Sequence, residues 1–163
     1  MLDTSRFSSL IADELKLAPT QVNALILGEH GDSMVPIWSS ATVNGLSLAG
    51  LSECTPSFQN AVFERTKGSG AEVLKRKGGA GWAVALAIRE VVHAVLLDKA
   101  ALLPVSSLVQ GVYGIRGVCL SVPSIVSRSG IRRQVEIKLW PKEQMGLQQS
   151  ARALQETVAK VKL

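Results

Sequence analysis

The segment from Leu27 to Val35 carries the side chains best suited to chemistry in this 163-residue chain. His30 stands there between Gly28 and Gly31, has a carboxylate on either side, and follows an apolar run that is typical of a strand. Histidine changes its charge near neutral pH, and glycines let the backbone approach a ligand closely. Core packing does not require glycines at these positions, so the pattern favours a functional His30, acting as a general acid or base, over a structural one.

Asp3 and Arg6 form a second group with chemical potential. Their spacing places them on one face of a predicted helix, near its start. In the structural interpretation they are a helix cap and a surface charge, and spacing alone favours this. In the functional interpretation, Asp3 orients a histidine and stabilises its positive form, while Arg6 binds a carboxylate through its planar guanidinium. The spacing does not decide between the two.

Composition restricts the classes of protein to consider. The chain is 47% apolar, which predicts one globular domain over residues 1–163. No run reaches the roughly 18 to 20 apolar residues that would cross a bilayer, and the polar N-terminus is not a secretory signal. Cys54 and Cys119 lack the spacing of metal ligands, so no metal site is expected. A cytoplasmic protein without a membrane partner is expected.

The net charge of +5 is unevenly distributed. Residues 101–163 carry nine Lys and Arg against three Asp and Glu, whereas residues 1–100 carry nine against ten. These basic residues alternate with apolar ones, and no set of aromatic side chains accompanies them for base stacking. A solvated basic face is therefore favoured over a nucleic-acid site, and attraction of small anionic substrates is the second possibility.

Apolar periodicity and turn residues predict an alternation of helices and strands. Residues 82–97 are predicted to form a helix with apolar side chains on nearly all of its faces. Such a helix is expected to be buried on more than one side. The other predicted elements are a helix over 3–17, a strand over 22–27, a hairpin over 35–48 that turns at Asn44-Gly45, a helix over 57–77 bent or divided at Gly68 and Gly70, strands over 102–108, 117–126 and 134–139, and a final helix from Pro141.

Several motifs together resemble one family. The segments Leu2–Phe7 (LDTSRF), Gly28–Ser33 (GEHGDS) and Val35–Ser39 (VPIWS) are similar to the C-terminal, substrate-binding domain of L-lactate/malate dehydrogenases. The similarity runs from end to end of the chain. Later segments that agree are Lys77-Gly78 followed by Trp82, Pro104–Ser106, Tyr113–Ile115 and Leu120–Pro123. The resemblance implies an α+β fold in which antiparallel sheets pack with helices and the Rossmann domain is absent.

The resemblance also implies roles for individual residues. His30 matches the acid/base that gives a proton to the keto oxygen of a 2-oxo acid, and Asp3 matches the carboxylate paired with it. Arg6 matches the arginine that binds the substrate carboxylate. Glu29 and the Trp38-Ser39 pair favour the lactate type over the malate type. Ala80 stands at a substrate-site position where lactate enzymes usually have threonine, which leaves malate/oxaloacetate as the second choice.

By the same resemblance, this chain corresponds to only half of an enzyme. The family's first half is a Rossmann domain that binds NAD through a glycine-rich turn after a strand. Gly68-Ser69-Gly70 lies in a helical stretch and is not that fingerprint. We therefore expect no cofactor to bind tightly to this chain alone, and no activity without a nucleotide domain supplied in cis or in trans.

Besides the small 2-oxo or 2-hydroxy acid, the resemblance implies two partners, which are the nucleotide domain and further copies of this chain. In the family, the stretch that matches residues 82–97 packs against the nucleotide domain, and the C-terminal half contributes to oligomer interfaces. A homo-oligomer is therefore expected. The alternative is a stand-alone module for assembly or binding, derived from this domain and without catalysis, in which the site residues are retained by descent.

Overall fold

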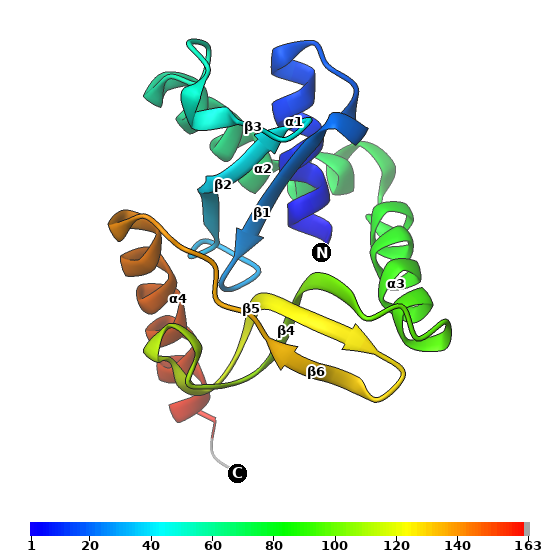
Figure 1. Ribbon diagram of the computed structural model, residues 1–163, viewed down its shortest axis with the longest axis vertical. Helices are drawn as coiled ribbons and strands as arrows, with labels where there is room; N and C mark the ends of the chain where they lie inside the picture. The colour runs from blue at the N-terminus through cyan, green and yellow to red at the C-terminus, as the bar shows by residue number, and fades with distance from the viewer. Residues whose placement is uncertain (162–163) are drawn as a thin grey trace.

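The computed structural model describes residues 1–161, which form two small antiparallel sheets surrounded by helices (Figure 1). One sheet has the order β1-β2-β3 and the other β4-β5-β6. The helices are α1 (Leu2–Leu15), α2 (Pro56–Lys77), α3 (Gly81–Leu96) and α4 (Pro141–Ala159). The strands are β1 (Val22–Leu27), β2 (Val35–Val43), β3 (Leu46–Ser47), β4 (Ala101–Gln110), β5 (Arg116–Ser127) and β6 (Gly130–Gln134). Short 3₁₀ turns occupy Pro19–Gln21, Leu48–Gly50 and Val112–Gly114.

The first core fixes α1 against the β1-β2-β3 sheet. Phe7 and Ile11, one helical turn apart, are fully buried. The Phe7 ring meets the Trp38 ring of β2 edge-to-face, with 4.8 Å between centroids, and Trp38 in turn contacts Phe58 of α2. Each such buried side chain stabilises the fold by about 1.5 to 3 kcal/mol. The orientation of α1, and of the polar residues at its start, follows from this packing.

The second core joins the β4-β5-β6 sheet to α4. Leu120 and Leu147 are buried there. Glu143, 5% exposed, completes the attachment: its Oε1 accepts from the backbone N–H groups of Trp38 at 2.7 Å and Ser39 at 2.9 Å, and its Oε2 accepts from that of Trp140 at 2.9 Å. A buried carboxylate is tolerated when hydrogen bonds satisfy it in this way. Glu143 thereby ties α4 to β2.

Most of the predicted elements are confirmed. The strand over 22–27 has the predicted bounds, and the hairpin turns at Asn44 and Gly45, whose φ angles of 47° and 85° suit a tight hairpin turn. The predicted α+β class, with antiparallel sheets packed with helices, is also confirmed.

The expected bend or division at Gly68 and Gly70 is wrong, because α2 is continuous from Pro56 to Lys77. Two helical glycines cost about 1 kcal/mol each relative to alanine. Thr55 accepts a hydrogen bond from the Phe58 N–H at the helix start, and Gly78 ends the helix in the left-handed conformation. These caps and the burial of Val62 and Thr66 outweigh the glycines.

The strand predicted over 134–139 is also wrong, because β6 runs from Gly130 to Gln134. The Val135 N–H still donates to the Pro123 carbonyl of β5 at 2.7 Å, but later backbone groups bond elsewhere. The Ile137 N–H donates to the Tyr113 hydroxyl at 2.9 Å, and the Lys138 carbonyl accepts from the Ser39 hydroxyl at 3.3 Å. Side chains from distant segments therefore replace strand pairing beyond Val135.

The helix predicted over 82–97 is present as α3, but the expectation that it is buried on more than one side is wrong for residues 1–161. Ala94 is its one buried residue, whereas Trp82 is 82% and Leu96 66% exposed. The helix lies at the side of the molecule and contacts β5 and α1 (Figure 1). Within residues 1–161, no helix combines the length and hydropathy needed to span a membrane.

Tyr113, the single tyrosine, provides a test of the packing around residues 111–137. It is buried, with φ at +54°, and burial raises the pKa of its phenol above the ordinary value of 10.0; Glu136 contributes in the same direction, whereas the hydrogen bond from Ile137 opposes it. Because the folded state favours the neutral phenol, its contribution to stability is full below pH 10 and disappears as pH rises through the folded pKa.

We expect spectrophotometric titration of tyrosinate in the folded chain to give a pKa above that of the urea-unfolded chain. Tyr113→Phe should reduce the alkaline loss of stability and, by removing the acceptor for the Ile137 N–H, lower the free energy of unfolding at neutral pH by about 1 kcal/mol. Equal folded and unfolded titration midpoints would contradict the buried placement of Tyr113.

Candidate active site

The start of α1 and the loop after β1 meet at one end of the β1-β2-β3 sheet. Thr4 connects them: its hydroxyl accepts from the Ile26 N–H at 3.0 Å and donates to the Ile26 carbonyl at 3.4 Å. The Met1 nitrogen donates to the Pro104 carbonyl of β4 at 2.8 Å. The first turn of α1 is thus fixed against both sheets, and Asp3 lies in that turn.

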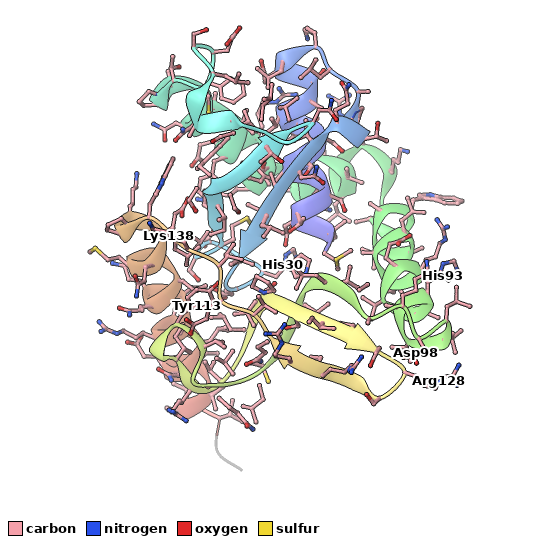
Figure 2. All side chains as sticks on the ribbon, viewed as in Figure 1. His30, His93, Asp98, Tyr113, Arg128 and Lys138 are labelled. Atoms are coloured by element: carbon pink, nitrogen blue, oxygen red, sulfur yellow. The ribbon has the colours of Figure 1, made fainter. Side chains whose placement is uncertain are left out.

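Asp3 connects the two other candidate residues. Its Oδ2 lies 2.5 Å from Nδ1 of His30, and its Oδ1 lies 3.3 Å from Nη1 of Arg6. The side chains of Asp3 and Arg6 are 13% and 14% exposed, whereas that of His30 is 72% exposed. Figure 2 shows His30 near the end of β1, between the two sheets. The structure therefore brings together three of the four residues that the sequence singled out.

Hydrogen-bond capacity decides the form of the imidazole. A carboxylate accepts and does not donate, so the Nδ1 atom that faces Asp3 carries the hydrogen. Neutral His30 then offers Nε2 as an acceptor, and positive His30 offers Nε2–H as a donor. With Asp3 fixing the ring, Nε2 is the atom through which His30 can exchange a proton.

Arg6 lies against the backbone of α2. A Cβ atom added to Gly70 would lie 3.3 Å from Nη1 and 3.7 Å from Nη2 of Arg6, so glycine leaves the guanidinium its space. Gly68, two residues earlier, would meet nothing within 4 Å. Sequence reasoning read both glycines as interruptions and missed the role of Gly70. The available signal was a glycine inside a helical pattern, which often has a packing reason.

Two cavities adjoin this group. Asp3 and His30 line one of about 790 Å³, whose other walls are apolar residues of α3 and residues of β4 and β5 that include Ser106 and Ser121. Arg6 lines an adjoining cavity of about 530 Å³ that also reaches α3. Met1 and Leu2 line both cavities.

Ala80 is not brought into this group. It occupies the N-cap position of α3 and lines neither cavity. Its proposed contact with substrate stays a prediction.

The residues that the structure describes contain no cluster of three or more His, Cys, Asp or Glu able to hold a metal ion. Cys54 and Cys119 are both free thiols. An imidazole oriented at Nδ1 by a carboxylate can transfer a proton at Nε2, and a guanidinium beside it is suited to binding a carboxylate.

Comparisons with known proteins agree over the whole chain. The family model for the lactate/malate dehydrogenase alpha/beta C-terminal domain matches residues 1–163. An L-lactate dehydrogenase of Gloeobacter violaceus is 40% identical over 97% of this chain and 49% of its own length. An L-lactate dehydrogenase of Salinibacter ruber is 41% identical over 98% of this chain and 52% of its own.

Solved structures give the same result. A ligand-bound minor L-lactate dehydrogenase from Enterococcus mundtii superimposes with a TM-score of 0.94 at 32% identity, covering 99% of this chain and 53% of that one. The malate dehydrogenase of Aeropyrum pernix superimposes with a TM-score of 0.92 at 27% identity, covering 99% and 52%. The chain thus spans about half the length of these relatives.

Proposed function

Because this chain belongs to the lactate/malate dehydrogenase family, as its C-terminal domain, we propose that it is the substrate-binding and proton-transfer half of an NAD-dependent L-2-hydroxy-acid dehydrogenase. L-Lactate and pyruvate are the favoured substrates. The observation that carries this proposal is the sharing of the Asp3 carboxylate between His30 and Arg6. That arrangement places a proton donor and a carboxylate-binding group on adjoining elements.

The proposed chemistry uses each of the three side chains differently. Arg6 binds the carboxylate of the 2-oxo acid. Positive His30 donates its Nε2 proton to the keto oxygen during reduction and takes it back from the hydroxyl during oxidation. Asp3 keeps the hydrogen on Nδ1 and stabilises the positive ring without itself exchanging a proton.

NAD supplies the hydride in such a reaction, but the described residues do not fit its binding. Both sheets in residues 1–161 are antiparallel, and no glycine-rich turn there leads from a parallel strand into a helix. The binding of the dinucleotide therefore belongs to a separate nucleotide domain, in cis or in trans. The isolated chain should be inactive.

The exposed face around His30 supports that division. His30 is 72% exposed, and the helix that borders its cavity presents a row of apolar side chains to solvent. The large, exposed apolar side chains of α3 are Trp82, Leu86, Ile88, Val92 and Leu96. A nucleotide domain covering this face would remove both His30 and these apolar groups from water. We propose that residues 82–97 pack against it.

The preference for lactate over malate has support of two kinds. Glu29 precedes His30 in this chain, and its carboxylate accepts a hydrogen bond from Ser33 within the same loop. The relatives named above include two L-lactate dehydrogenases at 40% and 41% identity. Ala80, which replaces a larger polar residue of the lactate type, keeps malate and oxaloacetate as the second choice.

The same exposed α3 face favours one alternative. Apolar patches of this kind promote self-association. A homo-oligomer formed through α3, working as an assembly module without catalysis, is the second candidate function.

Binding of oxamate, a pyruvate analogue, by isothermal titration calorimetry separates the two candidates. We expect the chain to bind oxamate and Arg6→Lys to weaken binding at least about tenfold, because lysine cannot form the paired hydrogen bonds of a guanidinium. Arg89→Lys, in the wall of the same cavity, is the matched control and should bind like the wild type.

Oxidation of NADH by pyruvate completes this test. It should require an added nucleotide domain from one of the relatives, and His30→Asn should abolish it. Hydride transfer by the chain alone would contradict the proposed division of labour. Absence of both oxamate binding and rescue would favour the assembly module.

A second prediction uses the pair of glycines in α2. Each Gly→Ala change should stabilise the helix by about 0.5 to 1 kcal/mol. Gly70→Ala should in addition displace the Arg6 guanidinium and weaken oxamate binding several-fold, whereas Gly68→Ala, which points into open space, should leave it unchanged. Urea unfolding and calorimetry measure the two effects separately. Equal oxamate affinities for the two variants would show that Arg6 does not bind the carboxylate from its position in this structure.

A further inference from the structure

We propose that Ser150 of α4 is a positioning residue for His30, acting through a closed ring of hydrogen bonds with Glu29 and Ser33. The inference rests on the proposed function, since the position of His30 matters for chemistry only if the imidazole transfers a proton. Ser150 is 120 residues later in the chain than His30, and nothing in the sequence pattern points to it.

The ring consists of three contacts. The Glu29 backbone N–H donates to the Ser150 hydroxyl oxygen at 2.8 Å. The hydroxyl oxygens of Ser33 and Ser150 lie 3.1 Å apart. The Ser33 hydroxyl also donates to the Glu29 carboxylate. Ser150 is fully buried, whereas Glu29 and Ser33 are half-buried, so the ring lies at the edge of the core.

The chemistry of the groups fixes every direction in the ring. The Glu29 carboxylate is an acceptor, so the Ser33 hydrogen is committed to it. Ser150 must therefore donate to Ser33, while a lone pair of Ser150 accepts the Glu29 N–H. All three residues are satisfied at once, and the loss of the Ser150 hydroxyl would leave the Glu29 N–H and the Ser33 lone pair without these partners.

Gly28 shows how closely α4 approaches this loop. A Cβ atom on Gly28 would lie 2.7 Å from the Ser150 hydroxyl oxygen, and the residue has φ at +89°. On its other side, Gly28 exchanges two backbone hydrogen bonds with Ser121 of β5, at 3.0 and 3.2 Å. The chain just before His30 is thus held between a helix and a strand.

His30 depends on this arrangement because its side chain is mostly exposed. Its ring is held at Nδ1 by Asp3, and its backbone follows directly from Glu29, whose N–H is fixed by Ser150. The helix that carries Ser150 is itself fixed by buried Leu147 and Ala151 and by Glu143. Ser150 therefore transmits the rigidity of the second core to the loop that carries the imidazole.

The test is ¹⁵N NMR of the two histidines of the full chain, recorded at a pH where both are neutral. In the wild type, the ring nitrogens of His30 should show hydrogen on Nδ1. In Ser150→Ala, the difference between the ¹⁵N chemical shifts of Nδ1 and Nε2 should decrease toward the value of mixed tautomers, because the loop no longer holds the imidazole against Asp3. His93, on α3, serves as an internal reference and should not change.

The control is Ser124→Ala, since Ser124 is equally buried and bonds to the Val122 carbonyl at 3.1 Å, within β5. It should lose stability like Ser150→Ala and leave the His30 resonances unchanged. Ser33→Ala removes a member of the hydrogen-bond ring that lies in the half-buried loop. It should change the His30 chemical shifts in the direction expected for Ser150→Ala, and it provides the test if Ser150→Ala does not fold.

Wild-type His30 resonances in Ser33→Ala and in folded Ser150→Ala would overturn the proposal, as would an equal shift in Ser124→Ala. The measurement involves no substrate. A failure of oxamate to bind the wild type would overturn the proposed function, but it would not overturn the positioning of the His30 imidazole by Ser150.

Discussion

The Asp3 carboxylate holds two side chains from different elements: His30 from the loop after β1, at 2.5 Å, and Arg6 from its own helix, at 3.3 Å. Because Arg6 lies on the same helix as Asp3, the contact that depends on the relative position of the helix and the loop is the one to His30. The edge-to-face packing of Phe7 on Trp38 orients α1, and the hydrogen bonds of Thr4 with Ile26 set its position along β1. Much of the first core can be understood as support for this one interaction.

Local patterns predict secondary structure in this chain better than they predict which distant residues meet in the site. The strand over 22–27 and the hairpin at Asn44-Gly45 follow from local periodicity and turn chemistry, which act over a few residues. The grouping of Asp3, Arg6 and His30 came from a family resemblance, because their spacing alone favoured a cap and a surface charge. The structure then supplied the distances.

The structural features that the sequence did not predict share a physical cause. Backbone groups after Gln134 bond to Tyr113 and Ser39, and Ser150 reaches Glu29 across 121 positions of sequence. Glu143 similarly bonds to Trp38 and Ser39 from more than 100 positions away. No local pattern encodes such partners. In α2, two glycines signalled a break, but caps and burial kept the helix continuous, and the structure instead places Gly70 against Arg6.

The exposed imidazole and the apolar face of α3 belong to one side of the domain. The proton transfer that we propose for His30 would be more effective where water is excluded, since electrostatic interactions strengthen in such a site. A domain that leaves this side open fits a site completed by a second domain, as the half-length match to the dehydrogenases suggests. The fixed groups of this half would then be ready before the second half closes over them.

The most direct test of the central interaction is the proton NMR signal of the His30 Nδ1–H. A strong hydrogen bond to Asp3 predicts a far-downfield resonance in the wild type and in Asp32→Asn, which changes an exposed carboxylate of the same loop. Asp3→Asn should lose that resonance while keeping the fold. The same downfield resonance in Asp3→Asn, or its absence from the wild type, would contradict the pairing of Asp3 with His30.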